Sequence, residues 1–302
     1  MKNKFFILLA AGLMILGCAK DPVQPVNPNS DPSNPNTPGD TTRTNPGDTT
    51  TTTIPVTDDK GILKAMPRGT DDAPYGYYVY TPEAYTTDTL KYPLLIYLHG
   101  SDEAGDSQGA PAELEKILGA GPPKMIDTKH WAPLHPMVVV APQCHEGWWD
   151  REHVRTFIRF ISTTYRIDTT RIYLTGISMG GNATIDQLNS FDDNQIAAAV
   201  PMGAGGVMND LFTQRMAAVP LWFFHGEEDQ TVLPEYVMTV VPAINALSPN
   251  VRAKLTLYPG VAHQCGEMTY TGAGMGKEDP SFSAFNMDIY TWMYQYTKTV
   301  KH

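Results

Sequence analysis

A serine stands between two glycines in the pattern G-x-S-x-G at residues 176–180, and a third glycine follows it. The apolar and β-branched residues 171–175 predict a buried strand before this turn, and residues 182–188 predict a helix after it. A serine at such a sharp turn has an unfavourable backbone conformation and needs small neighbours, but its Oγ stands clear of the backbone. This context predicts that Ser178 is a nucleophile, in preference to a glycine-rich turn that contains a serine by chance.

Partners that could activate Ser178 follow later in the chain. His263 comes shortly after the apolar residues 254–258, and a histidine there could take the serine proton and return it to a leaving group. A carboxylate on its other ring nitrogen must fix the tautomer, and Asp229 follows the apolar residues 221–224. The order serine, aspartate, histidine is the one that this kind of turn requires.

Three carboxylates compete for the role beside His263. Glu227 and Glu228 precede Asp229 in the segment H-G-E-E-D. We favour Asp229 because H-G-x-x-D places it beyond the tight turn, pointing back at the edge of the sheet. The two glutamates are then expected to be solvated residues of an acidic turn.

Two backbone amides are candidates to hold the negative oxygen of the reaction intermediate. The amide of Met179, directly after the nucleophile, is one, and the loop after residues 94–98 supplies the other at Ser101. His99 and His225 each precede a glycine at a strand end, too early in the chain order for the catalytic base. Both are expected to be structural histidines.

The elements that must position these residues alternate along the chain. A helix is expected at residues 151–165 and another at residues 285–298. Strands are expected at residues 75–82, 92–98, 137–142, 171–175, 196–200, 221–224 and 254–258. Strands that alternate with helices predict an α/β fold whose mostly parallel central sheet has helices on both faces, in the order of the α/β-hydrolase fold. Residues 58–302 are predicted to form this one catalytic domain.

Residues 1–17 combine a basic start with an apolar run that is too short to span a bilayer, which predicts a signal peptide. Ile15-Leu16-Gly17-Cys18 resembles a bacterial lipobox, and this resemblance implies that Cys18 is lipidated and becomes the mature N-terminus. The alternative is an ordinary secretory signal with an incidental cysteine. Residues 18–57, rich in Pro, Asn and Thr, are predicted to be a disordered tether.

The net charge of −10 disfavours nucleic acid or an anionic membrane surface as a partner. Loss of Lys2 and Lys4 with the signal peptide would bring it to −12. The expected partners are a small-molecule or glycan ester and, through the lipid anchor alone, a membrane. No cofactor and no metal are expected. A zinc site at Cys144, His145, His263 and Cys265 would consume the predicted catalytic histidine.

Several motifs together resemble one group of proteins. They are Leu98-His99-Gly100-Ser101, Ala141-Pro142-Gln143-Cys144, Trp148-Trp149, residues 167–176, Ser178-Met179-Gly180-Gly181 and Phe224-His225-Gly226. This pattern is similar to that of bacterial secreted esterases related to polyhydroxybutyrate depolymerases and to feruloyl or acetylxylan esterases, often labelled predicted peptidase or phospholipase/carboxylesterase. The resemblance covers roughly residues 76–296 and implies the α/β-hydrolase fold and a serine hydrolase.

The sequence departs from this pattern in two places. Asp102 replaces a glycine of the usual H-G-S-G-E-x-G loop, and its charge would be costly beside a developing oxyanion unless it points away or is paired. The segment after His263 lacks the usual tryptophan and continues through the glycine-rich residues 264–276. This segment could be a flap over the acyl pocket or a plain surface insertion.

Cysteines and tryptophans near the expected site leave further alternatives. Cys144 and Cys265 could form a disulfide in an oxidising compartment, but we favour two buried thiols. Trp148 and Trp149 are candidates to stack on a sugar or hydroxycinnamoyl group, with one of the two expected in the core. Trp131 and Trp222 are expected in the core.

The sequence therefore predicts an exported serine carboxylesterase, anchored by lipid in the bacterial cell envelope, that acts through an acyl-enzyme intermediate. Its expected substrates are acetyl or feruloyl esters on carbohydrate, or other small carboxylic esters. One alternative is a serine peptidase of the prolyl-oligopeptidase type, although the propeller domain of those enzymes is absent from the sequence. Another is a lipoprotein that has lost turnover and binds a glycan or a partner.

Overall fold

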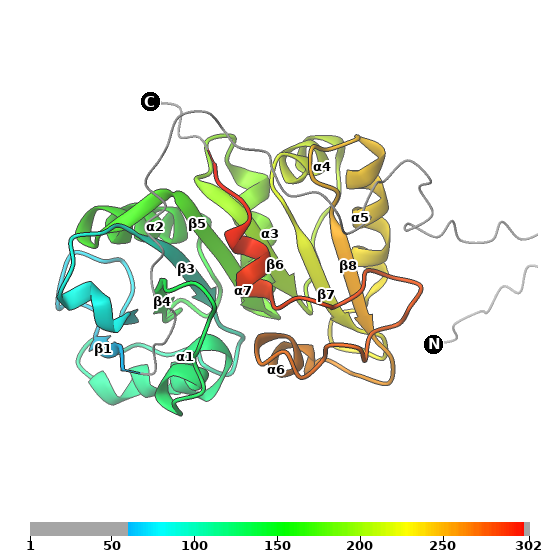
Figure 1. Ribbon diagram of the computed structural model, residues 1–302. Helices are drawn as coiled ribbons and strands as arrows, with labels where there is room; N and C mark the ends of the chain where they lie inside the picture. Colours follow the sequence, from blue (N-terminus) through cyan, green and yellow to red (C-terminus); the bar gives the residue numbers. More distant parts are fainter. Residues whose placement is uncertain (1–59, 299–302) are drawn as a thin grey trace, which may run out of the picture.

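The computed structural model describes residues 60–298. Within this range one eight-stranded sheet runs in the order β1-β2-β4-β3-β5-β6-β7-β8 (Figure 1). Its strands are β1 (Ile62–Met66), β2 (Tyr77–Thr81), β3 (Tyr92–Leu98), β4 (Val138–Pro142), β5 (Ile167–Ile177), β6 (Ile196–Met202), β7 (Trp222–Gly226) and β8 (Lys254–Tyr258). β1 and β2 pair in antiparallel fashion, β2 joins β4 in the same way, and all other neighbours are parallel. The predicted mostly parallel sheet is confirmed.

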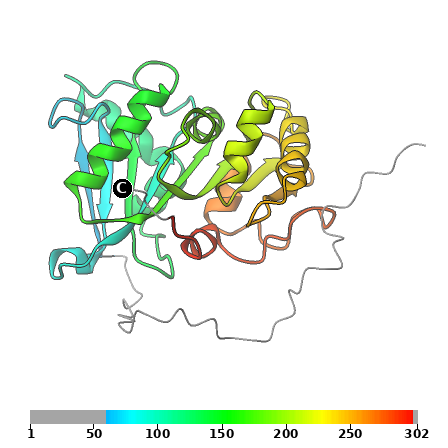
Figure 2. The ribbon, with the colours of Figure 1, turned by 90° about the horizontal axis from the view of Figure 1, so that it is seen from above.

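Helices cover both faces of this sheet, as Figure 2 shows from above. The helical elements are η1 (Glu83–Thr86), η2 (Pro111–Gly119), α1 (Gly121–Asp127), α2 (Arg151–Thr164), α3 (Met179–Ser190), α4 (Asp210–Ala217), α5 (Glu235–Ala246), α6 (Cys265–Tyr270) and α7 (Ile289–Tyr294). Apolar side chains of α2 to α5 join the core on one face, and those of η2, α1, α6 and α7 join the core on the other. Every residue of β3, β4 and β6 is buried, as expected for strands covered on both sides.

The strand register brings the ends of the central strands together. Leu98, the last residue of β3, lies beside Gly176 of β5, and Gly176 lies beside Pro201 of β6. The last residues of β7 and β8, Gly226 and Tyr258, also lie side by side. The loops that leave β3, β5, β6, β7 and β8 therefore start from one edge of the sheet, where open α/β sheets bind their ligands.

The sequence predicts a C-terminal helix over residues 285–298, but the helix in the structure is shorter. α7 starts after Asp288, whose side chain accepts a hydrogen bond from the Thr291 amide, and it ends at Tyr294. Phe285 lies outside the helix because its ring packs in the aromatic core against Trp222 and its amide donates to Glu278. The edge strand β1 was not predicted, since its residues are mostly exposed and form no apolar run.

Candidate active site

The backbone of Ser178 has the strained conformation that the sequence predicts. Its φ of 55° and ψ of −119° lie in a region that non-glycine residues rarely adopt. The flanking glycines are required by space, because a Cβ on Gly180 would lie 1.9 Å from the carbonyl oxygen of Leu98 and one on Gly176 would lie 2.4 Å from that of Gly180. The turn thus joins β5 directly to α3, and Met179 is the first helical residue.

A chain of two hydrogen bonds connects Ser178 to a buried carboxylate. His263 Nε2 is 2.7 Å from Ser178 Oγ, and His263 Nδ1 is 2.7 Å from Asp229 Oδ2. With Nδ1 protonated and donating to Asp229, Nε2 is free to accept the serine proton. The structure therefore brings together the three residues that the sequence selected from the ends of β5, β7 and β8. Glu227 and Glu228 are exposed.

Asp229 is fully buried and yet surrounded by donors. Burial acts to raise the pKa of its carboxyl group, but the hydrogen bond to His263 and those from the amides of Val232 and Thr231 outweigh it and lower the pKa. His225 Nε2 lies 3.2 Å from the same oxygen that faces His263 and 2.8 Å from the carbonyl oxygen of Val232. Asp229 is thus held ionised and in place. Sequence reasoning placed His225 in a structural role but missed its contact with Asp229, because no local pattern signals it.

His99 connects the loop that follows β3 to the segment after β4. Its Nε2 accepts a hydrogen bond from the Cys144 amide at 2.9 Å, so the ring proton is on Nδ1, which donates to the Gly100 carbonyl. In a trans peptide the C=O and the next N–H point in opposite directions, so this contact also sets the direction of the Ser101 amide. A Cβ on Gly100 would lie 3.8 Å from Ser178 Cβ, which places this loop directly beside the nucleophile.

Burial of His99 predicts a pH-dependent stability. Burial lowers its pKa to about 4 in the folded protein, against about 6.5 in an unfolded chain. Between these values only the unfolded chain binds the proton, so stability should fall by about 3 kcal/mol as the pH falls from 6.5 to 4. In urea denaturation, His99→Asn should be less stable than wild type at pH 7, and this difference should narrow by about that amount at pH 4. His225, whose pKa is also lowered by burial, is present in both proteins, so parallel curves would contradict the assignment to His99.

Asp102 is exposed, and its Oδ1 accepts a hydrogen bond from Ser101 Oγ at 3.3 Å. Its charge is therefore in contact with water rather than enclosed in the site. The next carboxylate, Glu103, is largely buried below the loop, and burial raises its pKa.

The two neighbouring tryptophans have different surroundings. Trp149 is only 4% exposed, its ring packs against His99, and its Nε1 donates to the His99 carbonyl oxygen at 3.2 Å. Trp149 is therefore the one of the pair that lies in the core, and its candidate role in substrate binding is corrected, because the protein covers its ring. Trp148 is 56% exposed, and its ring is available to a ligand. Trp131 and Trp222 are buried as expected.

The first half of the glycine-rich segment 264–276 is packed against the sheet, whereas residues 271–276 are mostly exposed apart from Gly274. Residues Cys265–Tyr270 form α6, Tyr270 is buried, and its hydroxyl lies 3.0 Å from Thr175 Oγ1 in β5. A Cβ on Gly274 would lie 2.6 Å from the Tyr258 hydroxyl, so this glycine serves close packing rather than mobility. Cys265 and Cys144 are both buried free thiols, as favoured over a disulfide.

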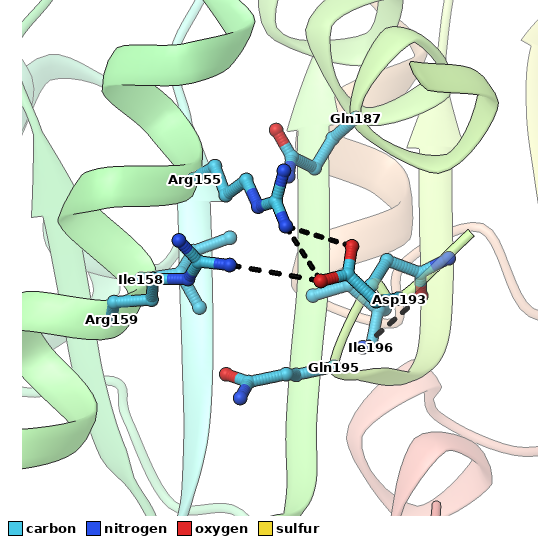
Figure 3. Close-up of a pocket in the computed structure, with 8 residues that line it drawn as sticks. Arg155, Ile158, Arg159, Gln187, Asp193, Gln195 and Ile196 are labelled. Atoms are coloured by element: carbon cyan, nitrogen blue, oxygen red, sulfur yellow. Dashed lines mark hydrogen bonds and ion pairs between the residues drawn. The ribbon is translucent and has the colours of Figure 1, made fainter. Parts of the chain in front are cut away.

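A surface pocket lies between α2 and the segment that leads into β6 (Figure 3). Arg155 donates two hydrogen bonds to Asp193 across it, and Arg159 lies 3.7 Å from the same carboxylate. Ile196, which also lines it, is the first residue of β6, so the pocket is at the opposite edge of the sheet from Ser178. We assign it a structural ion pair.

The predicted signal peptide, Cys18 and the tether lie outside the described residues. Among residues 60–298, none of the helices has the length and apolar character needed to cross a bilayer.

Comparison with known proteins gives one family match over most of the described chain. Residues 72–268 match the dienelactone hydrolase family. The bifunctional acetylxylan esterase/xylanase XynS20E of Neocallimastix patriciarum is 28% identical over 157 residues, which are 51% of this chain and 21% of that protein. The chain thus spans about a fifth of the length of this curated relative.

Two solved structures share the fold at low sequence identity. A thermostable esterase aligns with a TM-score of 0.54 and 24% identity over 80% of this chain and 64% of its own. A mutant of the feruloyl esterase module from Clostridium thermocellum, complexed with sinapinate, aligns with a TM-score of 0.51 and 16% identity over 70% of this chain and 84% of its own. The predicted α/β-hydrolase fold is confirmed.

Proposed function

Because the chain belongs to the dienelactone hydrolase family, we propose that it is a serine carboxylesterase that acts through Ser178, His263 and Asp229. The observation that carries this proposal is the continuous chain of hydrogen bonds from the strained serine to a buried, ionised aspartate. Such a chain is the arrangement that activates a serine hydroxyl for attack on a carbonyl group.

In the proposed reaction, Ser178 Oγ attacks the ester carbonyl carbon while His263 Nε2 takes the hydroxyl proton. The negative oxygen that forms accepts hydrogen bonds from the amides of Met179 and Ser101. When the intermediate collapses, the bond to the alcohol oxygen breaks and His263 gives its proton to the departing alcohol. Asp229 remains ionised throughout and stabilises the imidazolium.

Water completes the cycle. It attacks the acyl group on Ser178 while His263 Nε2 takes one of its protons, and the carboxylic acid leaves as the proton returns to Ser178 Oγ. The site as proposed needs no metal or cofactor in any of these steps.

The proposed substrates are esters with a small or aromatic acyl group, linked to carbohydrate or to another alcohol. The resemblance to an acetylxylan esterase and to a feruloyl esterase fold supports this range. The exposed ring of Trp148, in the loop after β4, is proposed to contact the acyl or sugar group. Anchoring in the cell envelope through Cys18 is part of the proposal and rests on the sequence of residues 1–18.

A substrate panel tests this function on the full-length chain. We expect turnover of p-nitrophenyl acetate, methyl ferulate or acetylated xylo-oligosaccharides, measured by product release, and much slower cleavage of a peptidyl p-nitroanilide. Faster cleavage of the anilide would favour a peptidase. A folded protein that hydrolyses none of the esters would favour the binding-protein alternative.

A further inference from the structure

The order of strands divides the surroundings of Ser178 into two sides. β5, which Ser178 follows directly, lies between β3 on one side and β6, β7 and β8 on the other. The loop after β3 supplies the proposed oxyanion donor Ser101, whereas Asp229 and His263 come from the ends of β7 and β8. The alcohol oxygen must receive its proton from His263 Nε2, so the alcohol part of an ester lies toward the side of β6 and β7.

The loop after β6 borders His263 directly. Gly203 has a positive φ of 49°, and a Cβ on it would lie 3.5 Å from His263 Cε1, so its backbone approaches the imidazole closely. Two residues later the Gly205 amide donates to Asn182 Oδ1 at 2.7 Å, in the first turns of α3. The loop is thereby tied to the helix that carries the nucleophile.

The same loop packs on the connection between β7 and α5. A Cβ on Gly205 would lie 3.2 Å from Val232 Cγ1, and one on Gly206 would lie 3.0 Å from the Tyr236 hydroxyl. The Val232 amide in turn donates to Asp229 Oδ1. The two segments form one continuous surface, fixed at one end to His263 and at the other to Asp229.

The two segments and the first turns of α4 and α5, into which they lead, carry a group of exposed apolar side chains. Val207, Met208, Leu211, Leu233 and Met238 are between 44% and 69% exposed, and we call them the apolar rim. They make up five of the eleven large hydrophobic side chains that are exposed among the described residues, so exposure of this kind is concentrated here. The charged residues Asp210, Glu228 and Glu235 are close to these residues in the sequence, but residues 203–209 include no charged side chain.

We propose that the apolar rim binds the alcohol part of the ester, and that this part is an alkyl or aryl group rather than a sugar. The inference rests on the proposed esterase function and narrows it. Aliphatic side chains gain from contact with methylene or ring carbon and offer no partners to sugar hydroxyls. Of the esters proposed above, those with an apolar alcohol should therefore be preferred.

Two ester series separate the alcohol side from the acyl side. In the alcohol series, the kcat/KM for hexyl acetate is divided by that for ethyl acetate. This ratio should be roughly tenfold lower in the double variant Met208→Gln, Leu233→Gln than in wild type. Each methylene in apolar contact contributes up to about fourfold to kcat/KM. The ratio for ethyl hexanoate to ethyl acetate should not change. Intrinsic reactivity cancels, because each ratio is compared with that of wild type.

Leu134→Gln is the matched control. Leu134 is 52% exposed and Leu233 is 53% exposed. Leu134 precedes the start of β4, whereas Ser178, Asp229 and His263 follow the ends of their strands. Its ratios should equal those of wild type. An unchanged hexyl-to-ethyl ratio in the double variant, or a fall confined to the acyl series, would overturn the proposal. So would a change in oligomeric state of the double variant with unchanged ratios, since the rim would then be a contact between copies.

A binding measurement tests whether the apolar rim binds an alcohol even if wild type hydrolyses none of these esters. In protein labelled with ¹³C at methionine methyl groups, titration with 1-hexanol should shift the signals of Met208 and Met238 in a saturable way. The signal of Met66, in the edge strand β1, should not move. Equal shifts at all three, or none, would reject the rim. Absence of ester turnover in wild type would reject the esterase function instead.

Discussion

Replacing Ser178 by alanine should lower kcat for every ester that wild type hydrolyses by about 10⁶-fold. The loss is large because the acyl-enzyme cannot form without Oγ, whereas the backbone amides beside it and the binding surface remain. A residual rate above that of water is expected from those groups. Steady-state kinetics, together with intact mass after treatment with a fluorophosphonate, measures both parts. Wild type should gain a single adduct and the variant none.

The same position offers a control for folding. Ser178 has a φ of 55°, and the strain of such a conformation costs on the order of 1 kcal/mol for a residue with a Cβ. Ser178→Gly should therefore be inactive like Ser178→Ala but melt at a higher temperature than either wild type or the alanine variant. Substantial activity in either variant would show that another nucleophile carries the reaction.

Local chemistry explains why the nucleophile and its partners could be predicted from the sequence. The glycines around Ser178 are needed for a close approach of backbones, and the apolar runs before Asp229 and His263 form the strands β7 and β8. Parallel strands then carry all three residues to one edge of the sheet, because each follows the end of its strand.

Contacts between distant segments explain what could not be predicted. Trp148 and Trp149 are neighbours in the sequence, and contacts with distant residues, such as the hydrogen bond from Trp149 to the His99 carbonyl and the packing of its ring on Tyr75, distinguish them. Glycines in residues 264–276 suggested mobility, but Gly274 is required where the chain packs on Tyr258. The apolar rim also has no sequence signal, since exposure of Leu233 depends on how neighbouring elements pack.

Asp229→Asn is expected to lower kcat by about 10⁴-fold while the protein stays folded. The asparagine carbonyl oxygen can still accept the amides of Thr231 and Val232, so its amide nitrogen would face His263 Nδ1. Both of these nitrogens would then carry hydrogen unless the His263 proton moved to Nε2. In that tautomer Nε2 is a donor and cannot take the proton of Ser178.

The neighbouring carboxylate makes this prediction specific. Glu228→Gln removes the same charge one residue away, but Glu228 is exposed and has no contact with His263. Its kcat should stay within about twofold of wild type, because an exposed charge is screened by solvent. Equal losses in the two variants, measured by steady-state kinetics on one ester, would mean that acidic charge near the site matters rather than the hydrogen bond to His263. A large loss in Asp229→Asn alone would assign the orientation of His263 to the buried carboxylate of Asp229.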